Sequence, residues 1–335
     1  SEEPTGRRKR TPNKAQSKEL KGSMDGRLQV FAGNGNRALA ERIMGELESS
    51  LGRATVDTWR NGETRVKLEE NVRGSDVFVI QSLSYPVNHH LVELLIMIDA
   101  IRRASASRVT AVIPYSAYAR QEKKTSGREP ISAKMVANLL VTAGVNRVLT
   151  LDLHAPAIEG FFDIPVDHLR ATPLLASYFR RLDPEGIVAV SPDSGGVGRA
   201  QEFRLRAGGG LAIIAKNRPA PDDTEVIEMV GDVEGKTAVL VDDMISTGGT
   251  LVQAAEMLKQ RGAAAVHAAA VHPVFAGDAM RIINDSPIER VIVTDSLPLP
   301  DGPCSSKVEV LTVAPLLAEA IMRIHKDLSI SALFS

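Results

Sequence analysis

Apolar and polar positions along the chain follow two alternating patterns. Short runs rich in β-branched and other apolar residues, such as LQVFAG and DVFVIQ, precede longer stretches such as ALAERIMGELESSLG and HHLVELLIMIDAIRRAS, in which apolar residues recur every three or four positions. The short runs are typical of buried strands, and the longer stretches are typical of amphipathic helices. Their alternation predicts βαβ units, which build mainly parallel sheets flanked by helices on both faces.

This alternation occurs in two series, which predicts two α/β domains. The first series continues through VTAVIPY, PISAKMVANLLVTAG and VNRVLTLDL. The second contains IVAVSPD, GVGRAQEFRLRAG, LAIIAK, TAVLVDD, TLVQAAEMLKQRG, VHAAAVHPV, AMRIINDS and RVIVTDS. We place the first domain at residues 27–168 and the second at residues 169–317. A chain of 335 residues with 44% hydrophobic composition is long enough to bury two such cores.

The first 26 residues break the pattern. They read SEEPTGRRKRTPNKAQSKELKGSMDG, which is polar and basic and has almost no large apolar side chain. Such a segment cannot bury enough apolar surface to offset the entropy that it would lose on ordering. We therefore expect residues 1–26 to form a disordered basic tail.

The composition excludes several classes of partner. Forty Lys and Arg residues against forty-one Asp and Glu residues leave a net charge of −1, so no overall field attracts nucleic acid or an anionic membrane. A charge interrupts the longest apolar runs well before the roughly 18–20 residues that a membrane span requires. The single cysteine, Cys304, cannot form an internal disulfide. We expect a cytoplasmic protein with small-molecule partners, which binds neither nucleic acid nor membrane.

The segment VLVDDMISTGGTL, residues 239–251, carries the clearest chemistry. A predicted strand leads into the adjacent carboxylates Asp242 and Asp243, then into a loop of serine, threonines and glycines, and then into a helix expected to begin near Leu251. This order places the loop at the carboxyl edge of the sheet, where open α/β folds bind ligands. Gly248 and Gly249 let an anion approach the backbone, and the helix N-terminus favours negative charge. The loop is therefore predicted to cradle a phosphate.

The two carboxylates would repel that phosphate, so they need other partners. Sugar hydroxyls, which donate hydrogen bonds, and a bound Mg²⁺ are both suitable. A phosphorylated ribose meets these demands together. A competing phosphate motif is excluded, because GDVEGKT has three residues between its glycines, where a P-loop has four, and it precedes a strand.

The segment resembles the ribose-phosphate loop of the type I phosphoribosyltransferase fold. Five other segments resemble those of ribose-phosphate pyrophosphokinases in the same order: VRGSDVFVIQS, RVTAVIPYSAYARQEKK, VLTLDLHAPAIEGFFDIPVDHL, VSPDSGGVGRA and VGDVEGKTAVLVDDM. Together they cover about Leu28 to Phe334. The resemblance implies two tandem phosphoribosyltransferase-like domains, with residues 318–335 completing the first.

The resemblance also implies an activity. Enzymes of this family use Mg²⁺ to move the diphosphoryl group of ATP to the C1 hydroxyl of ribose 5-phosphate, giving PRPP and AMP. It implies self-association as well, from dimers to hexamers. ATP contacts are implied for Asn61, Glu63, Arg120, Gln121 and His154. Metal contacts are implied for His154 and Asp193, although histidine is an unusual ligand for so hard a cation, which leaves open a contact through water or the triphosphate.

Catalysis is implied for Lys216 and Arg218, on a hairpin that closes over the triphosphate. Cations that arrive there stabilise the charge spread over the phosphoryl oxygens in the transition state. Strand alternation turns Asn217 to the opposite face, so its identity matters least. Ribose 5-phosphate contacts are implied for Arg218, Asp242, Asp243, Ser246, Thr247, Gly248, Gly249 and Thr250.

Two positions depart from the family pattern, and two other functions remain open. Trp59 stands where the family usually has Phe, and Ser246 stands where it commonly has Asp. A hydroxyl can still contact phosphate and removes a like charge, so we expect function to persist. The alternatives are a nucleobase phosphoribosyltransferase, which needs only one such domain, and a catalytically weak homologue that serves as a regulatory or assembly subunit.

Overall fold

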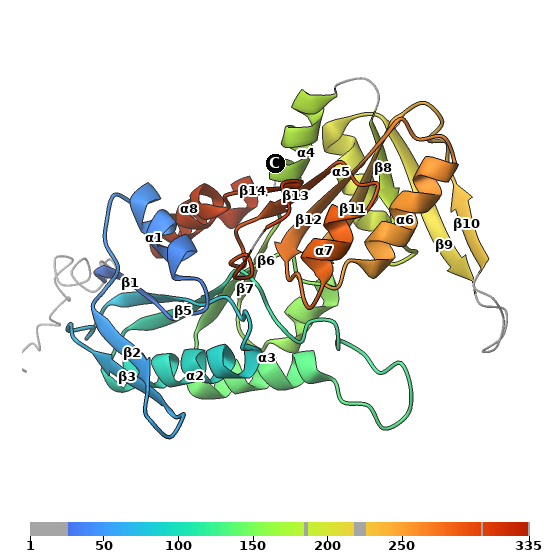
Figure 1. Cartoon of the computed structure of the whole chain (residues 1–335). Coiled ribbons are helices and arrows are strands. Elements are labelled where there is room, and N and C mark those ends of the chain that lie inside the picture. Colours follow the sequence, from blue (N-terminus) through green and yellow to red (C-terminus); the bar gives the residue numbers. More distant parts are fainter. Residues whose placement is uncertain (1–25, 184–186, 218–225, 303, 334–335) are drawn as a thin grey trace, which may run out of the picture.

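The computed structural model describes residues 26–183, 187–217, 226–302 and 304–333, which form two mainly parallel sheets (Figure 1). All but one residue of the predicted tail, and also Arg218, lie outside this range. The first sheet has five parallel strands in the order β1 (Leu28–Ala32), β4 (Asp76–Ile80), β5 (Arg108–Ile113), β6 (Arg147–Leu151) and β7 (Val166–Leu169).

Helices cover both faces of this first sheet. Helices α1 (Arg37–Glu46) and α8 (Ala314–His325) lie on one face, and α2 (Val87–Arg103) and α3 (Ser132–Ala143) lie on the other (Figure 1). Every residue of β4 is buried, as expected for a parallel strand enclosed by helices. An antiparallel hairpin of β2 (Ala54–Thr58) and β3 (Thr64–Leu68) projects beside α2.

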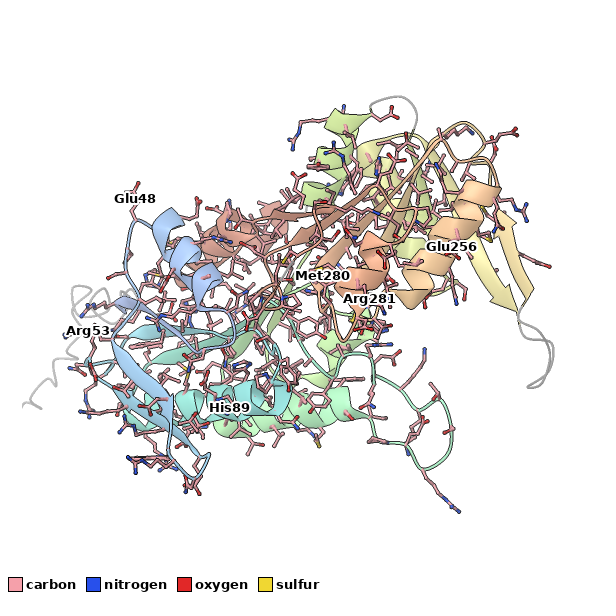
Figure 2. The ribbon with its side chains drawn as sticks, in the orientation of Figure 1. Glu48, Arg53, His89, Glu256, Met280 and Arg281 are labelled. Atoms are coloured by element: carbon pink, nitrogen blue, oxygen red, sulfur yellow. The ribbon has the colours of Figure 1, made fainter. Side chains whose placement is uncertain are left out.

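Among the described residues, the second sheet has seven strands, of which only β10 runs antiparallel to its neighbour. Their order is β10 (Val226–Val230), β9 (Gly210–Asn217), β8 (Ile187–Ser191), β11 (Thr237–Ile245), β12 (Ala265–Pro273), β13 (Arg290–Thr294) and β14 (Val308–Leu311). Helices α4 (Thr172–Leu182) and α5 (Val197–Ala207) pack on one face, and α6 (Gly249–Gln260) and α7 (Ala279–Asn284) on the other. Charged side chains such as Glu256 of α6 and Arg281 of α7 stand on the solvent side of these helices (Figure 2).

One apolar core joins the two sheets. It runs from Leu39 of α1 and Leu317 of α8 to Phe179 of α4 and Phe203 of α5. The prediction of an α/β fold with helices on both faces of parallel sheets is therefore confirmed, and the shared core holds the strand ends of both sheets in fixed relation. No helix in the part of the chain described here is long and apolar enough to cross a membrane.

Candidate active site

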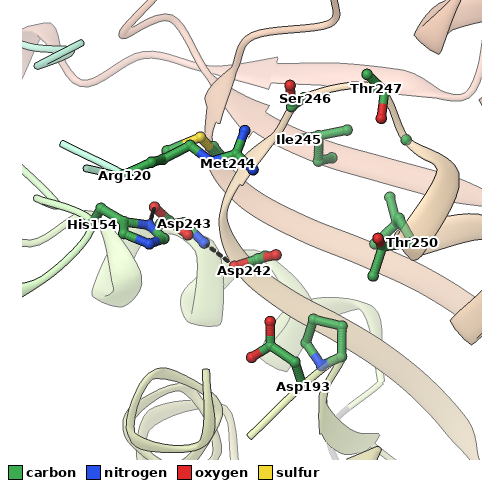
Figure 3. A pocket seen from close by; sticks show the side chains of 13 residues that line it. Arg120, His154, Asp193, Asp242, Asp243, Met244, Ile245, Ser246, Thr247 and Thr250 are labelled. Atoms are coloured by element: carbon green, nitrogen blue, oxygen red, sulfur yellow. Dashed lines mark hydrogen bonds and ion pairs between the residues drawn. The ribbon is translucent and has the colours of Figure 1, made fainter. Parts of the chain in front are cut away.

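A cavity of about 310 Å³ lies where the carboxyl ends of strands from both sheets converge. His154 follows β6 of the first sheet, Asp193 follows β8 of the second, and β11 supplies Asp242 and Asp243. Ligands of open α/β sheets bind at this end of the strands. The lining residues are Arg120, His154, Pro192, Asp193, Asp242, Asp243, Met244, Ile245, Ser246, Thr247, Gly248, Thr250 and Leu251 (Figure 3).

Strand β11 carries the acidic pair. The sequence predicts that the strand ends at these carboxylates, but it continues to Ile245, because Asp242, Met244 and Ile245 still pair with β12. Both carboxylates line the cavity, but Asp243 is buried, whereas Asp242 is partly exposed. The two neighbouring carboxylates therefore differ in their exposure to water.

Asp243 contacts two basic side chains. Its Oδ2 lies 2.8 Å from His154 Nδ1, and its Oδ1 lies 3.4 Å from Arg199 Nη2. The other terminal nitrogen of the guanidinium, Nη1, donates to Asp242 Oδ1 at 3.1 Å. Arg199 therefore bridges both carboxylates and offsets the repulsion between them.

These contacts separate the acidities of the two carboxyl groups. Burial acts to raise the pKa of Asp243, but the hydrogen bond with His154 and the charge of Arg199 outweigh it and hold that pKa well below its ordinary value. Burial and the neighbouring carboxylate raise the pKa of Asp242 to about 7. The hydrogen bond to Asp243 raises the pKa of His154, which favours the cationic imidazole. Asp243 is thus committed to its two basic partners, while Asp242 remains able to respond to a ligand.

The loop after β11 has the geometry of an anion cradle. Gly248 has a φ of 80°, in the left-handed region that favours glycine, and it is the N-cap of α6. The helix begins at Gly249, two residues before the predicted start at Leu251. The first N–H groups of a helix have no partner within the helix, so they can donate hydrogen bonds to an anion. The positive end of the helix dipole lies at the same place and attracts the anion as well. Ser246 and Thr247 line the cavity beside this N-terminus.

A second tight turn holds Asp193 at the cavity. Ser191 Oγ donates to the Asp193 carbonyl oxygen at 2.7 Å, and the Gly196 N–H donates to Asp193 Oδ1 at 2.8 Å. A Cβ at Gly196 would lie 2.8 Å from Ser191 Oγ, so any larger residue would force this turn to shift. The turn fixes one carboxylate oxygen of Asp193 by a backbone N–H.

The donor set suits Mg²⁺. Within the described ranges, no group of three or more His, Cys, Asp or Glu side chains could hold a metal by itself. Magnesium commonly takes only one or two protein carboxylates and completes its octahedron with water and substrate phosphates. Asp193 and Asp242 both line the cavity and offer hard oxygen donors of this kind. His154, with its raised pKa, fits better as a hydrogen-bond donor to phosphate.

Comparison with known proteins places this architecture in a family. Residues 28–144 match a family model described as the N-terminal domain of ribose phosphate pyrophosphokinase, and residues 212–335 match one described as the phosphoribosyl synthetase-associated domain. The ribose-phosphate pyrophosphokinase of Oceanobacillus iheyensis is 50% identical over 310 residues, which cover 92% of this chain and 98% of that protein. This chain belongs to the ribose-phosphate pyrophosphokinase family.

Other relatives support the same assignment. The ribose-phosphate pyrophosphokinase of Corynebacterium ammoniagenes is 50% identical over 312 residues, which cover 93% of this chain and 98% of that protein. The crystal structure of phosphoribosylpyrophosphate synthetase from Mycobacterium smegmatis matches with a TM-score of 0.86 and 44% identity, over 90% of this chain and 99% of that one. The family resemblance and the two-domain fold predicted from the sequence are therefore confirmed.

Several residues expected in the pyrophosphokinase site do not line this cavity. Asn61 and Glu63 lie in the exposed turn between β2 and β3, where the Glu63 N–H donates to Asn61 Oδ1 at 3.2 Å. Figure 1 shows that hairpin well away from β11. Gln121 is exposed beside Arg120, and only Arg120 reaches the cavity lining.

The position of Lys216 is known from its backbone. Ile213 of β9 pairs with Ser191 of β8, so Lys216 lies beyond the end of β8, at the edge of the sheet where Asp193 stands. The Lys216 backbone pairs with Ile227 of β10, in the antiparallel pair that the family resemblance leads one to expect. The side chain of Lys216, and Arg218 as a whole, lie outside the described part of the structure.

Sequence reasoning missed Arg199, which bridges the acidic pair. It lies in the first turn of α5, directly after the turn that carries Asp193. A cation near a helix N-terminus opposes the helix dipole and needs an acidic partner to offset that cost. An arginine in the first turn of GVGRAQEFRLRAG was therefore a usable signal that carboxylates lie opposite it.

Proposed function

We propose that this ribose-phosphate pyrophosphokinase family member transfers the diphosphoryl group of ATP to the C1 hydroxyl of ribose 5-phosphate, giving PRPP and AMP. The observation that carries this proposal is the position of the acidic pair and the phosphate cradle in one cavity, which also receives His154 from the other sheet. A site of this kind suits a sugar phosphate next to a second, polyphosphate substrate.

We assign separate roles to the two ends of the cavity. The 5-phosphate lies in the cradle formed by the loop and the N-terminus of α6, and the ribose hydroxyls donate to Asp242. Asp243 contacts ligand less directly, because His154 and Arg199 already occupy its two oxygens. The cradle residues are Ser246, Thr247, Gly248, Gly249 and Thr250, and Arg218 completes the contacts with ribose 5-phosphate.

ATP lies on the side of the cavity formed by the first sheet. Arg120 and the cationic form of His154 contact its phosphates, and Gln121 adjoins them. Because Asn61 and Glu63 lie away from this cavity, we propose that they reach the base of an ATP bound to a neighbouring copy. Self-association is then required for a complete ATP site. Residues 27–168 and 318–335 form the ATP-side domain in this arrangement. The compartment that we propose is the cytoplasm.

The reaction requires charge stabilisation more than covalent help from the protein. The C1 hydroxyl oxygen attacks the β-phosphorus of ATP, the bond from that phosphorus to the α,β-bridging oxygen breaks, AMP leaves, and the hydroxyl proton passes to water. Asp193 would hold Mg²⁺, which when bound would neutralise phosphate charge. Lys216 and Arg218 approach as negative charge spreads over the phosphoryl oxygens.

An AMP-release assay tests this proposal against its alternatives. With ATP and ribose 5-phosphate together, we expect AMP to form, and omission of either substrate should abolish it. A nucleobase phosphoribosyltransferase would instead consume PRPP in the presence of a base. A regulatory or assembly subunit would give no AMP under any of these conditions.

Replacing Asp242 by asparagine should weaken ribose 5-phosphate binding by about 1.5–3 kcal/mol, the contribution of a hydrogen bond to a charged group. The affinity for ATP should change less, because Asp242 faces the sugar. Titration calorimetry with each substrate measures both effects. Asp232→Asn is the matched control, since Asp232 is exposed and pairs with Lys236 away from the cavity. Equal losses for both substrates would show that Asp242 supports the fold or a shared metal instead.

Replacing Ser246 by alanine should cost only about 0.5–1.5 kcal/mol in ribose 5-phosphate binding, the net contribution of one neutral hydrogen bond. Ser246→Asp should be tolerated, because the family resemblance implies an acidic residue at this position. Substrate titration of both variants provides the measurement. An inactive Ser246→Ala enzyme with an intact fold would contradict this modest role.

A further inference from the structure

A buried histidine connects the second sheet to the segment that carries His154. His272 lies on β12 and is 2% exposed. Its Nε2 lies 3.1 Å from the Asp152 carbonyl oxygen, and its Nδ1 lies 2.9 Å from Ser296 Oγ. The ring packs edge-on against Tyr115, with 5.0 Å between the ring centroids. The imidazole is thus enclosed by polar and aromatic groups from both sheets.

The hydrogen-bonding partners fix the tautomer of His272. A carbonyl oxygen can only accept, so Nε2 must carry a proton. Burial lowers the pKa of His272 to about 4, which keeps the ring neutral with that single proton. Nδ1 must then accept from the Ser296 hydroxyl. The backbone carbonyl of Ser296 accepts in turn from Ser82 Oγ at 2.7 Å. Hydrogen bonds therefore connect Ser82, which follows a strand of the first sheet, through Ser296 and His272 to Asp152, which follows another strand of that sheet.

The short segment Asp152–His154 is held at each of its residues. Besides the bond to the Asp152 carbonyl, the Ala171 N–H donates to Asp152 Oδ2 at 2.6 Å. The Leu153 N–H donates to His168 Nε2 at 2.8 Å, and His154 bonds Asp243. Asp152 has a φ of 39°, which is uncommon for a residue other than glycine and needs such support.

Two of these bonds come from the second sheet and are made by neighbouring strands. Strand β12 reaches the Asp152 carbonyl through His272, and β11 reaches His154 through Asp243. The bonds with Ala171 and His168 hold the segment to its own side of the molecule, whereas these two bonds, two residues apart, fix its direction against the second sheet. The bond from His272 therefore helps to align His154 with Asp243.

We infer that His272 is a positioning residue for the diphosphoryl transfer: its Nε2–H bond to the Asp152 carbonyl holds the segment of the first sheet that carries His154 in alignment with the acidic strand of the second. This inference rests on the proposed function. His272 lines no part of the cavity and touches neither substrate in the proposed arrangement, so it acts through His154.

Three variants separate this role from simple packing. His272→Gln places an amide N–H near the position of Nε2 and keeps the bond to Asp152. His272→Asn places its polar atoms near the position of Nδ1, so it keeps a partner for Ser296 and loses the bond to Asp152. His272→Phe keeps the ring against Tyr115 and loses both bonds.

We expect His272→Gln to keep kcat within about threefold of the parent enzyme, and His272→Asn and His272→Phe to lose about tenfold, the scale of one buried hydrogen bond. The KM for ribose 5-phosphate should change less than about twofold, since the cradle and Asp242 do not depend on His272. His267→Asn is the matched control: His267 is buried on the same strand, and its Nδ1 has no hydrogen-bond partner among the described residues.

A magnetic resonance measurement on His154 needs no catalytic activity, so it tests the role of His272 separately from the proposed function. In protein with ¹⁵N-labelled histidine, the signal of the His154 Nδ1 proton should be sharp in the parent and in His272→Gln, because the bond to Asp243 protects that proton from exchange with water. The same signal should broaden in His272→Asn. Equal kcat for the Gln and Asn variants, a parallel rise in KM for ribose 5-phosphate, or an unchanged His154 signal in the Asn variant would overturn the inference. If the Phe variant does not fold, the Gln and Asn pair decides alone.

Discussion

Truncating Lys216 to alanine should lower kcat by about 10²–10³-fold, the scale of losing one preorganised electrostatic donor. The KM for ATP and for ribose 5-phosphate should change far less. Lys216 lies at the edge of the second sheet where Asp193 stands, on the strand that pairs with β10. A cation that approaches only as phosphoryl charge develops stabilises the transition state and contributes little to ground-state binding. Steady-state kinetics with each substrate varied in turn measures both quantities.

The neighbouring residue provides the matched control. Strand β9 runs through Asn217, and successive strand residues face opposite ways, so Asn217→Ala should leave turnover nearly unchanged. A general disturbance of the β9–β10 pair would affect both positions alike. Near-normal turnover of Lys216→Ala, or equal damage from Asn217→Ala, would contradict the catalytic role of Lys216.

Replacing Arg199 by methionine should destabilise the fold by about 3–5 kcal/mol, the usual cost of removing one partner of a buried ion pair. The side chain of Arg199 is 18% exposed and that of Asp243 is 3% exposed, so water cannot replace the lost cation fully. Among the described residues, His154 would then be the one basic side chain in contact with the two adjacent carboxylates. Urea denaturation, followed by circular dichroism, measures the loss.

The pH dependence of this loss has a definite sign. Without Arg199, the pKa values of Asp242 and Asp243 rise in the folded state, because their charged forms lose a stabilising partner. Protonation at low pH relieves the repulsion, so the variant should lie closer to the parent at pH 5 than at pH 8. Arg37→Met, which removes an exposed pair with Glu41 on α1, is the control and should cost less than about 1 kcal/mol. A stable Arg199→Met enzyme at pH 8 would show that the bridge is dispensable.

The elements that the sequence predicts well are those buried on both faces. Strands β1, β4, β5, β6, β8, β11 and β12 have continuous apolar runs, and their helices have clear three-to-four periodicity. The sequence did not reveal the hairpin of β2 and β3, because ATVDT and TRVKL are half exposed and mix polar with apolar residues. It did not reveal β7 or β14 either, since each has only four residues.

The site was predictable where its chemistry is continuous along the chain. The acidic pair and the cradle form one segment, so their shared cavity follows from strand, loop and helix order. Arg199 contacts carboxylates that lie 43 and 44 residues further along the chain, and His272 contacts a carbonyl 120 residues before it. Strand and helix patterns in the sequence do not encode such pairings. The distance of Asn61 and Glu63 from the cavity is likewise a consequence of tertiary structure.

The products of one reaction distinguish diphosphoryl transfer from every alternative. Purified protein incubated with ATP, ribose 5-phosphate and Mg²⁺ should form AMP and PRPP in equal amounts without ADP, as measured by anion-exchange chromatography. Formation of ADP with a singly phosphorylated C1 product would show attack at the γ-phosphorus. No consumption of ATP by correctly folded protein would contradict the enzymatic assignment altogether.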